Sequence, residues 1–97
     1  MNTRSEYDLL GYLDVSADAW YGIQTQRAAN NFAITGVPIS HFPELIRALA
    51  MVKQAAALTN HDFGLLNATK TEAIVSACED IASGLYHDQF IVDVIQG

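Results

Sequence analysis

The chain has 97 residues, of which 51% are apolar and 16% charged, and its net charge at pH 7 is −6. This length gives one domain at most, with a charged fraction below the roughly 25% typical of soluble domains. Only five Lys and Arg are present, which argues against a nucleic-acid or anionic membrane partner. The apolar runs are too short to span a bilayer and no signal-peptide region opens the chain, so we expect a cytoplasmic protein.

Cysteine and histidine usage gives no sign of a metal centre. Cys78 is a single cysteine, so it cannot form an internal disulfide, and we expect a buried, reduced thiol. The three histidines, His41, His61 and His87, are far apart and lack the spacing of zinc motifs. We therefore predict no metal site.

The chain opens with a segment that predicts a small hairpin or an extended arm. Residues 7–15 form two short apolar segments around Gly11. A helix over residues 19–31 is expected next, because the side-chain oxygen of Ser16 or Asp18 can satisfy free amides in its first turn.

One face of this first helix carries the most distinctive chemistry of the chain. Trp20, Gln24, Arg27 and Asn31 share that face at helical spacing. The guanidinium of Arg27 is a planar cation suited to binding a carboxylate, with Trp20 and Gln24 beside it. The alternative is an ordinary surface or interface arginine whose stem covers an aromatic ring.

The central helix is expected to start at Pro43 and to continue past Asn60. Pro suits the first helical position, and no Gly or Pro interrupts the following residues. Its apolar arc is too wide for an ordinary amphipathic helix, so we expect a buried helix. The arc consists of the stripe Leu45, Leu49, Val52 and Ala56, widened by Ile46, Ala50 and Ala57.

Two polar residues, Lys53 and Asn60, fall inside this apolar arc. They are seven positions apart and so lie at nearly the same angle around the helix. One interpretation is a polar pair directed at a site or a subunit contact. The other is structural: Lys53 snorkels or meets a carboxylate such as Glu79 or Asp80, and Asn60 caps the helix end.

A third helix and an apolar C-terminal segment complete the chain. Thr69 with Glu72 matches a capping box, and Gly84 is expected at the C-terminal end of the helix. Its apolar stripe is Ile74, Ala77, Cys78, Ile81, Ala82 and Leu85. Residues 86–97 predict a buried extended or short helical segment, and an end this apolar predicts that a longer protein continues beyond it.

These elements predict a mainly α fold, a small orthogonal helical domain of about three main helices with a short N-terminal β-hairpin or arm. No phosphate-binding loop, nucleophile elbow or zinc signature is present in the sequence. Carboxylate pairs such as Asp88 with Asp93 are interpreted as surface or capping groups. The residues alone therefore support a helical module with an Arg27 face.

The order of several short segments resembles the opening of the aspartase and class II fumarase superfamily, over nearly the whole chain. Within the superfamily the chain is more similar to the aspartase branch, and Trp20-Tyr21 inverts the order associated with fumarases. Ser16 stands where a proline is usual, a change in a turn that should matter little to chemistry. The segments that carry the resemblance are Asp8-Leu9-Leu10-Gly11, residues 17–28, Ile34-Thr35-Gly36, Val52-Lys53, Asn60, Gly64-Leu65-Leu66, Asp88-Gln89-Phe90, Asp93 and Gln96-Gly97.

The resemblance implies that residues 1–97 are the N-terminal domain of a homotetrameric lyase that converts L-aspartate to fumarate and ammonia. It implies no organic cofactor and leaves divalent-metal activation of the whole enzyme open. In the family, Gln96-Gly97 leads into the first substrate-binding loop, and the catalytic histidine, serine and lysine follow in later segments. The resemblance thus implies no catalytic residue in this chain, with Arg27, Gln96 and Gly97 as substrate-proximal candidates.

Two alternatives remain open at this point. The chain is also compatible with the N-terminal domain of a class II fumarate hydratase or another paralogue, since the resemblance implies that specificity is determined downstream. A helical interaction module without enzymatic activity is the other. Exposed apolar surface on the chain by itself predicts self-association.

Overall fold

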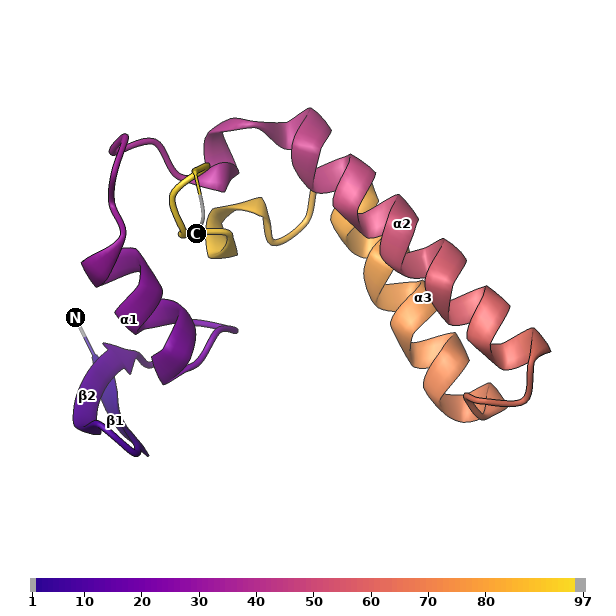
Figure 1. The fold of residues 1–97 in the computed structure, drawn as a ribbon, viewed down its shortest axis with the longest axis horizontal. Coiled ribbons are helices and arrows are strands. Elements are labelled where there is room, and N and C mark those ends of the chain that lie inside the picture. Colours follow the sequence, from indigo (N-terminus) through magenta and orange to yellow (C-terminus); the bar gives the residue numbers. More distant parts are fainter. Residues whose placement is uncertain (1, 96–97) are drawn as a thin grey trace. The chain divides into compact units, whose positions relative to one another are not determined.

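The structure, a computed structural model, describes residues 2–95. These residues form two compact units, one of residues 2–41 with 88–95 and the other of Phe42–His87, and each is described by itself. The prediction of three main helices with an N-terminal β-hairpin is confirmed (Figure 1). The elements are β1 (Thr3–Asp8), β2 (Gly11–Ser16), α1 (Ile23–Asn31), the 3₁₀ turn η1 (Ile39–His41), α2 (Pro43–Asp62), α3 (Ala68–Ala82) and the 3₁₀ turn η2 (His87–Gln89).

The hairpin begins earlier than the sequence suggested. β1 and β2 pair antiparallel from Thr3 opposite Ser16 to Asp8 opposite Gly11. Leu9 and Leu10 form the turn, and Gly11 follows at φ +113°, a conformation that favours glycine. Both faces of β1 carry mostly polar side chains. The alternation of apolar and polar residues that marks a half-buried strand is therefore absent, and the sequence pattern could not reveal this strand.

Helix α1 starts at Ile23, so the expected start near residue 19 was wrong. Ser16 is paired in β2 and neither it nor Asp18 caps the helix; the N-cap is Gly22, without a side-chain cap of its own. The reason is the Arg4 side chain. It binds backbone carbonyls between β2 and α1 and so holds this connection outside a helix.

The last described segment of the first unit, residues 90–95, is extended. This is one of the two conformations, extended or short helical, that the sequence predicted for residues 86–97. It lies antiparallel to the loop before α2, with a bridge between Pro38 and Asp93. The backbone N–H of Ile39 donates to the carbonyl of Val92 at 2.9 Å, and that of Val94 donates to Val37 at 2.9 Å. These bonds join the two stretches of chain that make up the unit.

In the second unit, α2 and α3 lie side by side and antiparallel (Figure 1). Each helix is followed by a glycine with positive φ, Gly64 at +74° after α2 and Gly84 at +110° after α3. After α2, Leu65 N–H donates to the carbonyl of Asn60 at 2.8 Å, which is the long bond of a Schellman motif. The predicted end of the third helix at Gly84 is confirmed.

The buried side of α2 differs from the predicted stripe. Ile46, at 0% exposure, Ala50 and Ala57 are buried, but the stripe of Leu45, Leu49, Val52 and Ala56 is exposed, with Val52 at 68%. The expectation that this stripe is buried was wrong, because α3 covers a different arc of the helix.

The N-terminus of α3 also corrects the prediction. Asn67 is the N-cap, and its Oδ1 accepts from the backbone N–H of Lys70 at 2.8 Å. Thr69 already lies inside the helix, so the proposed capping box is not used. Cys78 is buried and free, as predicted.

Candidate functional site

Three charged side chains share one face of β1. Arg4, Glu6 and Asp8 alternate along the strand, so they point to the same side. Each of them binds a part of the chain between β2 and the middle of α1. This face therefore organises the helix that carries Arg27.

Arg4 holds the connection into α1 through its guanidinium group. Its Nε donates to Glu6 Oε2 at 2.6 Å, and its Nη2 donates to the carbonyl of Tyr21 at 2.6 Å. Its Nη1 donates to three further carbonyls. They belong to Ser16, Ala17 and Ala19, at 3.1, 3.1 and 2.8 Å.

Glu6 supplies the cap that α1 lacks locally. Its Oε1 accepts from the backbone N–H of Ile23, the first residue of the helix, at 2.8 Å. Two hydrogen bonds lower the pKa of the Glu6 carboxyl: the bond from Arg4 has the larger effect, and the bond from Ile23 the smaller one. A Cβ on Gly22 would lie 3.1 Å from this same Oε1, so glycine leaves room for the carboxylate.

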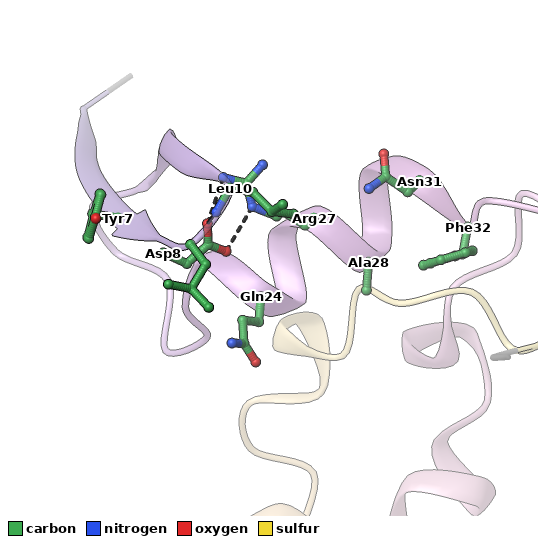
Figure 2. Close-up of a pocket in the computed structure, with 9 residues that line it drawn as sticks. Tyr7, Asp8, Leu10, Gln24, Arg27, Ala28, Asn31 and Phe32 are labelled. Carbon is green, nitrogen blue, oxygen red and sulfur yellow. Dashed lines mark hydrogen bonds and ion pairs between the residues drawn. The ribbon is translucent and has the colours of Figure 1, made fainter.

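Asp8 and Arg27 form a bidentate ion pair (Figure 2). Arg27 Nε lies 2.9 Å from Asp8 Oδ2, and Arg27 Nη2 lies 3.0 Å from Asp8 Oδ1. Arg27 Nη2 also donates to the carbonyl of Gly11 at 3.1 Å. The hydrogen bonds from Arg27 lower the pKa of the Asp8 carboxyl, so the pair is charged at neutral pH.

A cavity of about 740 Å³ lies beside this pair, between the hairpin turn and α1. Its walls are mostly apolar, and Asp8 neutralises the charge of Arg27 there. A carboxylate ligand would have to compete with Asp8 for the guanidinium or to use its remaining edge. The lining residues are Tyr7, Asp8, Leu9, Leu10, Gln24, Arg27, Ala28, Asn31 and Phe32.

The buried carboxylate of Asp93 ties the C-terminal segment to the loop after α1. Its Oδ2 accepts from the backbone N–H groups of Thr35 and Gly36, each at 2.9 Å. Its Oδ1 accepts from the Thr35 hydroxyl at 2.8 Å and from Ile95 N–H at 2.9 Å. Burial raises the pKa of Asp93, but these hydrogen bonds outweigh it and the pKa is lowered.

The structure brings only some of the predicted residues together. Gln24 and Asn31 line the cavity with Arg27, whereas Trp20 is not among its lining residues. Lys53 and Asn60 are exposed rather than buried, and their side chains make no hydrogen bond or ion pair within residues 2–95. Asn60 contributes only its backbone carbonyl to the end of α2.

The remaining predictions concern the last two residues of the chain, metal binding and membrane-spanning helices. Gln96 and Gly97 lie outside the described residues. Between residues 2 and 95, no group of three or more His, Cys, Asp or Glu side chains is arranged to hold a metal ion. None of the helices described there is long and apolar enough to cross a membrane.

Sequence reasoning missed Arg4 and Glu6. It interpreted Asp93 as a surface or capping group, whereas the structure buries this carboxylate. The signal for the first two was the alternation of Arg4, Glu6 and Asp8 at a period of two. The signal for Asp93 was a single acid in an apolar run, which has to be satisfied when it is buried.

Comparisons with known proteins agree on one family. The family model described as "Lyase" matches residues 11–97. An aspartate ammonia-lyase from Pseudomonas aeruginosa is 57% identical over 96 residues, covering 99% of this chain and 20% of that protein. A class II fumarate hydratase from Halobacterium salinarum is 46% identical over 93 residues, covering 96% of this chain and 19% of that protein.

The same likeness extends to solved structures. The fumarate lyase:delta crystallin from Brucella melitensis bound to cobalt matches with a TM-score of 0.86 and 52% identity, over 99% of this chain and 21% of that one. The chain thus spans about a fifth of the length of the relatives it matches.

Proposed function

The chain belongs to the lyase family whose model matches residues 11–97, and from this membership we propose that it is the N-terminal domain of an aspartate ammonia-lyase. The observation that carries the proposal is the 57% identity to such an enzyme over nearly the whole chain. The identity to a class II fumarate hydratase is lower, at 46%. A fumarase is therefore the second candidate.

The proposed reaction of the whole enzyme is the reversible elimination of ammonia from L-aspartate. A base removes a proton from the carbon next to one carboxylate, and the bond between the neighbouring carbon and nitrogen breaks to give fumarate. A negatively charged intermediate of this kind needs hydrogen-bond donors and cations around it. We propose a cytoplasmic homotetramer without an organic cofactor for this chemistry.

Residues 1–97 by themselves are proposed to be inactive. Within this domain the proposed role of Arg27 is to support carboxylate binding or activation near the mouth of the assembled site. Its position beside a cavity supports this role, and its pairing with Asp8 limits it, since the fork of the guanidinium is already engaged on one edge. Gln96 and Gly97 remain proposed substrate-proximal residues.

The test is fumarate formation by the longer protein that contains this chain. Purified enzyme is offered L-aspartate and L-malate in parallel, and the 97-residue chain is assayed as the matched control. The proposal expects turnover of aspartate by the long protein and none by the chain alone. Turnover of malate only would assign the parent to the fumarases, and fumarate production by the chain alone would refute its inactivity.

A further inference from the structure

The α2 helix has one covered side and one uncovered apolar side. α3 packs over the arc that contains Ile46, Ala50 and Ala57, all of them buried. About 110° away around the helix lies a second arc. This uncovered arc consists of Leu45, Leu49, Val52 and Ala56, which are exposed in the structure.

The spacing of this uncovered arc specifies the shape of its partner. Its residues follow one another at intervals of four, three and four, which is the seam of a coiled-coil-like helix pair. Small side chains flank the seam at Ala48 and Ala55, so a second helix can approach closely. Eleven steps from Leu45 to Ala56 at about 1.5 Å each give a seam of roughly 16 Å, so an α-helix of three to four turns would cover it.

The charge beside the seam specifies the chemistry of that helix. Lys53 is exposed on the edge of the seam, and within residues 2–95 it has no ion-pair partner. A covering helix would partly desolvate this ammonium group, and a carboxylate facing it would offset that cost. The partner helix should therefore carry an acidic residue on the matching edge.

A second copy of α2 does not meet this requirement. In a two-fold antiparallel pair each edge faces its own copy, so Lys53 would face the exposed α2 edge of Lys53 and Asn60, which has no acid. In a parallel pair Lys53 would face the edge of Ala48 and Ala55 on the other copy of α2. The acid on that edge is Asp62, which lies far from the middle of the seam.

We propose that the uncovered arc of α2 is the docking surface for an amphipathic α-helix with an acidic edge, supplied by the part of the parent protein outside residues 1–97. The relatives are about five times as long as this chain, since the chain covers 20% of such a protein, so a helix of this length is available. The inference rests on the proposed function only in requiring a longer parent.

The test places the photo-crosslinking amino acid p-benzoylphenylalanine at Val52 of the full-length parent, and at Glu79 on the exposed face of α3 as the matched control. Mass spectrometry identifies the peptides joined after irradiation. We expect Val52 to cross-link to a helix outside residues 1–97, at several times the yield from Glu79. A cross-link to residues 1–97 of a second copy, or a yield no higher than the control, would overturn the proposal.

Charge variants at Lys53 test the acidic edge separately. In the full-length parent, Lys53→Glu is expected to lower Tm more than Lys53→Gln, because only the first variant places two carboxylates together. Equal effects would refute the acidic edge. Neither readout depends on activity, so a parent that fails to convert aspartate while Val52 still cross-links would refute the proposed function and leave the docking surface supported.

Discussion

Asp8 and Arg27 are nineteen residues apart in sequence, and the carboxylate of Asp8 accepts two hydrogen bonds from the Arg27 guanidinium at 2.9 and 3.0 Å. The pair joins the hairpin turn to the middle of α1. Two parallel N–H···O bonds fix both the position and the plane of the guanidinium. Arg27 is therefore held in one orientation at the wall of the cavity rather than extended into solvent.

This geometry predicts different effects for two substitutions in the full-length enzyme. Arg27→Lys keeps the charge but loses the fork, so KM for aspartate should rise about tenfold if the fork contacts or orients a carboxylate. Asp8→Asn keeps the guanidinium and removes the competing charge, so KM should rise far less than in Arg27→Lys, while Tm decreases because one of the two bonds that orient the fork is lost. Unchanged kinetics in Arg27→Lys would make Arg27 a purely structural residue.

The cap of α1 by Glu6 predicts a sensitivity at Gly22. Gly22→Ala places a Cβ 3.1 Å from Glu6 Oε1, and this carboxylate cannot easily move because Arg4 and Ile23 both bind it. Hydrogen exchange of the first-turn amides of α1 should accelerate several-fold. Glu6→Gln is the matched comparison: it keeps an oxygen acceptor and should accelerate exchange less. Unchanged exchange in Gly22→Ala would contradict the cap.

The carboxylates of Glu6, Asp8 and Asp93 predict a loss of stability in acid. Their pKa values are lowered in the folded state, so the unfolded chain binds protons at higher pH than the folded chain does. The stabilisation is therefore present above the unfolded values of about 4 and is lost as the pH falls through the folded values. The urea midpoint should decrease steadily below about pH 4, and Asp93→Asn should flatten this decrease. A midpoint that rises in acid would contradict these pairings.

The packing of α2 against α3 predicts a contrast between two aliphatic residues of α2. Ile46 is 0% exposed and Leu49 is 46% exposed. Ile46→Ala should lower the free energy of unfolding of the chain by about 2–5 kcal/mol, because it leaves a cavity. Leu49→Ala should cost far less in the same chain. Urea denaturation measures both, and equal costs would contradict the assignment of the buried arc.

The N-cap of α3 predicts a second contrast. Asn67→Ala should lower the free energy of unfolding by about 1 kcal/mol, since it removes the acceptor for the Lys70 N–H. Thr69→Ala, at the position favoured by the sequence pattern, should be nearly neutral or slightly stabilising because Thr69 is inside the helix. A larger loss from Thr69→Ala than from Asn67→Ala would restore the capping box.

The fold class could be predicted from local signals. Pro43 at the start of α2, Gly84 after α3 and Gly11 at the hairpin each act through backbone conformation within a few residues. The start of α1 could not be predicted in this way. It depends on Arg4 and Glu6, which act from another strand, and a nearby Ser or Asp gave a stronger local signal than any distant cap.

The buried side of α2 was ambiguous for a physical reason. A helix that is apolar almost all round gives no preferred direction for its core, so the stripe with the larger side chains was favoured. α3 uses the neighbouring arc, where Ala50 and Ala57 allow closer approach. Similarly, Arg27 could be selected as the distinctive cation, but its partner Asp8 depends on tertiary packing.

The ratio of kcat/KM for L-aspartate to that for L-malate distinguishes an aspartate ammonia-lyase from a fumarase, and it is measured by fumarate formation with the full-length protein that contains this chain. An aspartate ammonia-lyase predicts a ratio far above one, with ammonia released in step with fumarate. A ratio far below one, or no fumarate from either compound, would contradict the proposed function.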